Sequence, residues 1–150
     1  MSLKRDIDAD LKQALLSGDK RLVSVLRGVK SVILNEEVAQ GKRESGLEDA
    51  VIIGLLQKEI KKRKEAAALY RQAGDSDRTD QEEYEAKVIS GYVPEMMSEA
   101  EVADMVKTVI SELGVEDMSG MGRVVGEAKK RSQGRADGAV IAKIAKEQLG

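Results

Sequence analysis

The sequence predicts an all-α protein, and three observations lead to this class. Apolar residues recur at intervals of three and four along most of the chain, which is the period of an amphipathic helix. Residues that cap helices precede several of these runs, and glycines follow them. No alternating run of β-branched residues occurs, and the one Asp-Gly dipeptide stands before a helical pattern.

The N-terminal part, residues 1–93, is expected to form a module of four helices. Ser2 and Asp19 are candidate caps of the first two helices, Gly18 ends the first, and the second continues to about Gln40. The apolar spacing then predicts a long helix over residues 47–73.

The fourth helix is expected to begin at Thr79, because Thr79 and Glu82 have the spacing of a capping box. It would pair with the long helix as an antiparallel hairpin. Its acidic residues, Glu82, Glu83 and Glu85, would then face part of the basic cluster Lys58–Lys64.

The single proline, Pro94, indicates a boundary between modules, because the residue before a proline disfavours the helical region. Residues 95–150 are expected to form a small three-helix module. Its helices would be capped by Ser98, which forms a capping box with Glu101, by Ser119 and by Asp137.

The composition excludes several classes of site. The chain has no His, Cys, Trp or Phe and three Tyr. We therefore expect no zinc or haem site, no disulfide, no His-based catalytic centre and no cofactor. Clusters of acidic residues, such as Glu36 and Glu37, are interpreted as solvated helix faces in a chain with 27 acidic residues, so no metal is expected.

The overall charge and hydropathy favour a water-soluble protein. The net charge is −2, and no apolar run is long enough to span a membrane. The first six residues are charged and do not resemble a signal peptide. The expected location is therefore the cytoplasm.

The charge of the C-terminal module is polarised. Residues 95–120 hold one basic and seven acidic residues, whereas residues 121–150 hold seven basic and three acidic ones. Such a basic segment can contact phosphates without reading bases, and helix N-termini near Gly120 and Gly138 would add amide donors. The alternative is an internal salt-bridge lattice with the acidic fifth helix. The candidate nucleic-acid-binding residues are Arg123, Lys129, Lys130, Arg131, Arg135, Lys143 and Lys146.

The glycine-rich stretch over residues 118–126 is interpreted as a tight turn into a short helix. It is one residue too long for the dinucleotide fingerprint, no strand precedes it, and it lacks the Gly-Lys-Ser/Thr ending of a P-loop.

Several short segments, taken in order, resemble the GatB/YqeY family, and YqeY-like proteins in particular. The similarity covers nearly the whole chain. The segments in the first module are Arg27–Ser31, Asn35–Glu37, Glu59–Glu65, Tyr70–Gly74 and Tyr92–Pro94; those in the second are Met121–Gly126 and Gly134–Gly138.

The resemblance implies an all-helical fold whose second module is similar to the tail of the B subunit of tRNA-dependent amidotransferase. In that enzyme the tail is thought to engage tRNA, and other parts perform the chemistry. The similarity of the tail alone thus implies a classification as a carbon–nitrogen ligase with glutamine as amido donor. We expect no catalysis by this chain itself.

The leading hypothesis is a non-catalytic module that binds tRNA or another structured RNA through the seven tail residues, extended by Lys61, Lys62 and Lys64. Two alternatives remain. One is a protein-interaction adaptor whose polarised tail docks on a partner. The other is an accessory subunit of the glutamine-dependent amidotransferase.

Overall fold

The computed structural model describes residues 2–150, and over this range it contains α-helices and one short 3₁₀ turn but no strand. The all-α prediction is therefore confirmed. The chain divides into two compact units, Met1–Val93 (unit 1) and Pro94–Gly150 (unit 2).

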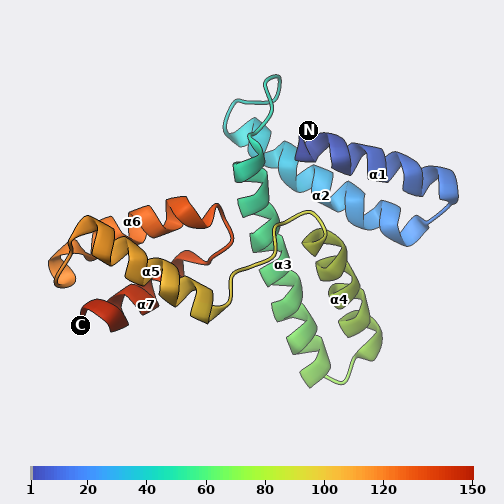
Figure 1. Ribbon diagram of the computed structural model, residues 1–150. Coiled ribbons are helices and arrows are strands. Elements are labelled where there is room, and N and C mark those ends of the chain that lie inside the picture. Colours follow the sequence, from blue (N-terminus) through green and yellow to red (C-terminus); the bar gives the residue numbers. More distant parts are fainter. Residues whose placement is uncertain (1) are drawn as a thin grey trace. The chain divides into compact units, whose positions relative to one another are not determined.

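Unit 1 consists of two helical hairpins. In Figure 1, α1 (Leu3–Ser17) and α2 (Lys20–Ala39) form the blue hairpin. The green pair is α3 (Asp49–Gln72) and α4 (Ser76–Ser90).

The caps of the first two helices match the predictions. The side chains of Ser2 and Asp19 accept hydrogen bonds from the amides of Arg5 and Leu22. Gly18 ends α1 with a φ of 75°, a left-handed conformation that glycine adopts without steric cost.

The predicted start of the fourth helix at Thr79 is wrong, because the helix begins one turn earlier. Asp75 is the N-cap, and its carboxylate accepts a hydrogen bond from the amide of Arg78 at 3.1 Å. The hydroxyl of Thr79 donates to the carbonyl of Asp75 at 2.7 Å, so it lies inside the helix that it was expected to cap.

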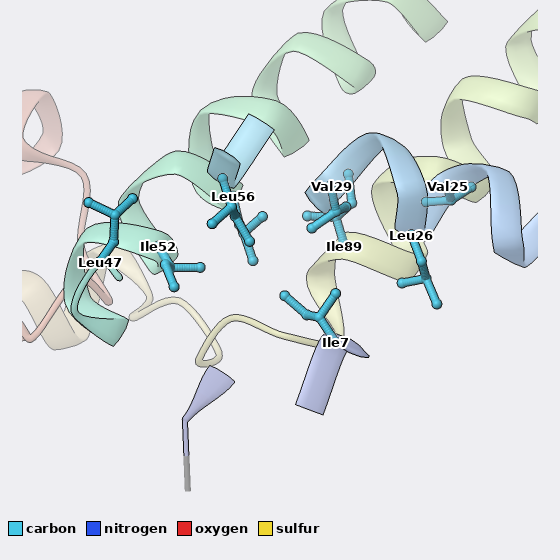
Figure 2. Packing of buried hydrophobic residues seen from close by; sticks show 9 residues of the cluster. Ile7, Val25, Leu26, Val29, Leu47, Ile52, Leu56 and Ile89 are labelled. Carbon is cyan, nitrogen blue, oxygen red and sulfur yellow. The ribbon is translucent and has the colours of Figure 1, made fainter. Parts of the chain in front are cut away.

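The core of unit 1 is built from aliphatic side chains of all four helices. Figure 2 shows Ile7 of α1, Leu26 and Val29 of α2, Leu56 of α3 and Ile89 of α4 around a common centre. Each of these residues is at most 3% exposed. At roughly 1.5–3 kcal/mol for each fully buried side chain, their burial is the main favourable contribution to folding of the unit.

Glu37 is a charged residue within this otherwise apolar interior. Its side chain is 1% exposed, and both carboxylate oxygens accept hydrogen bonds from Lys4 Nζ, at 3.1 and 2.9 Å. The expectation that Glu36 and Glu37 lie on a solvated face is therefore wrong for Glu37. Glu37 is four residues after Ile33 and eight after Val29, so it lies on the same buried face of α2 as these two residues.

Tyr92, near the C-terminal end of unit 1, forms a hydrogen bond to the first helix. Its hydroxyl donates to Asp10 Oδ2 at 2.5 Å, and its ring packs against the core. Partial burial, the hydrogen bond to Asp10 and the negative charge of Asp10 raise the pKa of Tyr92 above its ordinary value.

Unit 2 is a three-helix bundle made of α5 (Glu99–Leu113), α6 (Met121–Ser132) and α7 (Gly138–Leu149). Val106, Val109, Val124 and Ile141 are fully buried in its core. The predicted capping box of α5 is confirmed: Ser98 accepts from the Glu101 amide, and Glu101 accepts from the Ser98 amide.

The start of α6 differs from the prediction. Gly120, not Ser119, is the N-cap, and a short 3₁₀ turn, Met118–Gly120, precedes it. Ser119 instead donates its amide and its hydroxyl to Asp117, which lowers the pKa of Asp117. A Cβ at residue 120 would overlap the side chain of Val115, so this position requires glycine.

The first prediction concerns the buried ion pair. Lys4→Met removes the cation that neutralises Glu37 and should lower the free energy of unfolding by roughly 1–3 kcal/mol, because a buried carboxylate loses its partner. Lys30→Met is the matched control. It breaks the Lys30–Asp8 pair, whose side chains are 43% and 45% exposed, and should cost at most about 1 kcal/mol. Urea unfolding measures both, and equal losses would contradict the assignment.

The second prediction concerns Tyr92. Tyr92→Phe should lower the free energy of unfolding by about 0.5–1.5 kcal/mol near neutral pH, because one hydrogen bond is lost. The pKa of Tyr92 is higher in the folded than in the unfolded chain, so its contribution is complete below about pH 10 and declines above it. The native protein should thus lose more stability than Tyr92→Phe between about pH 9 and about pH 11. If the urea midpoints of the two proteins change in parallel with pH over this range, the prediction is contradicted.

The third prediction compares two glycines of unit 2. Gly126→Ala should raise the free energy of unfolding by about 0.5–1 kcal/mol, because residue 126 lies in a helix interior with no atom near the added Cβ. Gly120→Ala should lower it by about 1–3 kcal/mol through overlap with Val115. Thermal or urea unfolding checks both signs, and a loss of stability in Gly126→Ala would show that α6 does not pack as described.

Candidate nucleic-acid interface

The seven candidate residues of the tail lie on two helices and the loop between them. The helix α6 carries Arg123, Lys129, Lys130 and Arg131, and the helix α7 carries Lys143 and Lys146. Arg135 lies in the connecting loop. All except the half-buried Arg135 are exposed.

Arg131 is the one candidate that forms ion pairs. Its guanidinium contacts the carboxylate of Glu112 on α5 and that of Glu127 on its own helix, the latter at 3.1 Å. The hydrogen bonds to Glu112 and Glu127 raise the pKa of Arg131. Its charge is therefore largely balanced inside unit 2.

Arg135 has a structural role. Its Nε donates to the carbonyl of Glu95 at 2.9 Å, and its own carbonyl accepts from the amide of Met97 at 2.7 Å. These two bonds hold the segment that leads into α5 against the α6–α7 loop. The side chain is consequently engaged in packing the unit.

The other five candidates form no ion pair within residues 2–150. Arg123 and Lys130 are seven residues apart on α6, and Lys143 and Lys146 are three apart on α7, so each pair shares one face of its helix. The buried residues Val124, Ala128, Ile141 and Ile144 occupy other faces of these helices. The alternative, an internal salt-bridge lattice with α5, is seen among these residues only at Arg131. We call Arg123, Lys129, Lys130, Lys143 and Lys146 the free tail cations.

Two exposed glycines lie beside these cations on α6. Gly122 and Gly126 are helical, and no other atom lies within 4 Å of a Cβ built at either position. They leave the helix backbone bare next to Arg123 and Lys130. A flat, cationic helix face of this kind allows a phosphate chain to approach closely.

The helix N-termini contribute less than expected. Asp137 caps α7 through a 2.9 Å bond from the Ala139 amide, so a carboxylate already occupies the N-terminus near Gly138. Gly120 provides no side-chain cap for α6, but Asp117 stands just before it. The side chains therefore carry most of the positive field of this surface.

The basic cluster of α3 is paired only in part. Arg63 lies 3.5 Å from Glu82 and 3.3 Å from Glu85, as the hairpin interpretation predicts, and 3.5 Å from Glu59. Lys62 Nζ lies 3.6 Å from a carboxylate oxygen of Glu59, and the Lys62 side chain is itself exposed. Within the described chain, Lys61 and Lys64 have no acidic partner.

The fold places two further cations near Lys64 that were not predicted from the sequence. Arg71 of α3 and Lys87 of α4 line, with Lys64, a hollow of about 350 Å³ between the two helices. Arg71 is seven residues after Lys64 and so shares its helix face, which is a signal that the sequence contains. Lys87 comes from another helix, and its position depends on the hairpin alignment.

Two other kinds of feature are absent from the residues that the structure describes. None of the helices over residues 2–150 is long and apolar enough to cross a membrane. The same residues contain no group of three acidic side chains arranged to hold a metal ion.

Comparison with known proteins identifies relatives over nearly the whole chain. The chain is 28% identical to altered inheritance of mitochondria protein 41, mitochondrial, of Pyrenophora tritici-repentis over 147 residues, which cover 96% of this chain and 79% of the relative. It is 32% identical to the protein of the same name from Lachancea thermotolerans over 111 residues, which cover 72% of this chain and 58% of that relative.

These relatives contradict the expected cytoplasmic location, because both are named as mitochondrial proteins. The expectation used charge, hydropathy and the first few residues. Those features bear on membrane insertion and secretion, but they do not distinguish one aqueous compartment from another.

A family model provides the broadest match. The model described as Yqey-like protein matches residues 4–149, which include every helix of both units except the first residue of α1. This agrees with the resemblance seen in the order of the sequence segments. The chain belongs to the YqeY-like protein family.

Proposed function

We propose that this chain is a non-catalytic helical protein that binds tRNA or another structured RNA through backbone phosphates, using unit 2. The observation that carries the proposal is the set of free tail cations. Five exposed positive side chains on two adjacent helices form no ion pair within the described chain, and such a surface attracts polyanions.

The chemistry of the surface favours phosphate contacts over base recognition. The three tyrosines of the chain all belong to unit 1, so unit 2 offers no ring on which a base can stack. Lysine and arginine beside bare backbone suit the phosphates and the shape of a folded RNA. The resemblance of unit 2 to the tail of the amidotransferase B subunit supports tRNA as the first RNA to test.

The acidic residues of unit 1 give no support to catalysis. Glu59, Glu82 and Glu85 form one acidic group there, and all three face Arg63. Their charges serve the α3–α4 packing. We therefore propose that any link to amidotransferase chemistry is through tRNA or through contact with that enzyme.

The fourth prediction tests the free tail cations by salt-dependent binding. The tail variant replaces Arg123, Lys130, Lys143 and Lys146 by Gln. Labelled tRNA should bind the native chain more weakly as salt rises from about 50 to about 200 mM. The log–log slope should fall in magnitude by about 2–4 in the variant, since each lost phosphate contact contributes about 0.9. Fluorescence anisotropy measures both proteins.

The control makes the same charge change elsewhere. Lys12, Lys20, Arg27 and Lys42 are exposed residues of unit 1 outside any ion pair in the described chain, and replacing them by Gln also removes one arginine and three lysines. The control should retain nearly the native salt slope. Equal losses in the two variants, or no binding of tRNA by the native chain at low salt, would refute the proposal.

The adaptor alternative predicts a different result in cell extracts. A protein that acts through RNA should lose its co-purifying partners when the extract is treated with RNase, whereas an adaptor should retain them. Retention in the native chain together with loss in the tail variant would assign the free tail cations to a protein partner. An accessory subunit would, in addition, alter the turnover of purified amidotransferase.

A further inference from the structure

The hollow between α3 and α4 is a second cationic site that the sequence analysis did not define. The two helices lie side by side in Figure 1, and the hollow between them measures about 350 Å³. We call it the α3–α4 groove. Lys64 and Arg71 of α3 and Lys87 of α4 line it, and Glu83 is the one acidic residue of its lining.

The floor of the groove is made of small residues. Ala67 is 3% exposed and Ala86 is 4% exposed, and both contribute to the lining. A methyl group on each helix leaves space above it that a larger side chain would fill. The hollow therefore lies over the two alanines, where the helices pack closely. The longer side chains of the lining surround it.

The charge of the groove is positive and only partly compensated. Arg71 is paired with Glu83, and both side chains are about half exposed or more. Lys64 and Lys87 have no acidic partner within residues 2–150. The lining thus carries three cations and one anion, a net charge of +2.

The opposite side of the same hairpin has the reverse balance. There, Glu59, Glu82 and Glu85 surround Arg63, and Lys62 also contacts Glu59, so the group carries a net charge of −1. Segregation of most acids to one side leaves Glu83 as the one anion of the groove lining, so the groove keeps a net positive charge that attracts anions.

A phosphate group fits the donors that the groove offers. Two lysines provide mobile point charges, and Arg71 keeps several N–H donors beyond those that Glu83 occupies. The Ser90 hydroxyl is not a donor here, because it donates to the carbonyl of Ala86 at 2.7 Å. These donors suit the oxygen atoms of a phosphate group held by side chains.

We propose that the α3–α4 groove binds phosphate groups, as phosphodiesters of the RNA that the free tail cations also contact. The identity of the RNA rests on the proposed function, whereas the groove itself rests on the residues of unit 1. Two phosphate-binding surfaces on one chain make the second contact intramolecular when one RNA reaches both of them.

The test uses the full chain with Lys64 and Lys87 both replaced by Gln. We expect weaker binding of labelled tRNA and a salt slope reduced in magnitude by about 1–2, since two phosphate contacts are lost. Lys12→Gln with Lys20→Gln is the matched control and should keep the native slope. Lys64→Arg with Lys87→Arg keeps the charge and should keep most of the affinity. A groove variant that binds like the control overturns the RNA assignment.

A second measurement separates the two sources of phosphate. Inorganic pyrophosphate is titrated into the full chain while the amide NMR signals of Ala67 and Ala86 are followed. Shifts that vanish in the Lys64/Lys87 variant support a phosphate site, whether or not RNA uses it. Absence of shifts, together with unchanged tRNA binding, rejects the groove as a phosphate site.

The outcome for the groove is independent of the outcome for the tail. Loss of binding in the tail variant alone leaves the proposed function standing and refutes the groove as an RNA contact. Loss in the groove variant alone supports the groove and refutes the assignment of RNA binding to unit 2.

Discussion

The close packing of α3 against α4 determines how the charges of unit 1 are distributed. Ala67 and Ala86 are buried between the two helices, and their small side chains allow the backbones to approach. This alignment directs Arg63 toward Glu82 and Glu85 on one side. It leaves Lys64, Arg71 and Lys87 around the groove on the other side, so a chain of near-zero net charge presents polarised surfaces.

Much of the fold follows from local signals in the sequence. The helical period, the glycines with left-handed φ and the side-chain caps at Ser2, Asp19 and Ser98 each act over a few residues, so they can be recognised without a structure. The predicted start at Thr79 is wrong because two candidate N-caps of α4 lie one helical turn apart in the sequence. Asp75 caps the helix one turn earlier, and the Thr79 hydroxyl bonds back to the Asp75 carbonyl.

The pairing of charges was less predictable than the helices. Seven tail cations look alike in the sequence, yet Arg131 binds Glu112 on another helix and Arg135 binds the backbone at Glu95. Both contacts join residues that are far apart in the chain, so they depend on tertiary packing. The groove is hard to predict from the sequence for the same reason, because Lys64 and Lys87 line one hollow only when α3 and α4 are packed together.

The Glu37–Lys4 pair gives unit 1 a property that its aliphatic core cannot provide. Isoleucine, leucine and valine fill space almost interchangeably, so α1 sliding along α2 by one turn would still bury apolar surface. Such a shift, about 5.4 Å, would pull the Lys4 ammonium away from a carboxylate that is 1% exposed. The alternative register would therefore contain an unpaired buried charge. The ion pair thus selects a single alignment of the two helices and acts through specificity more than through added stability.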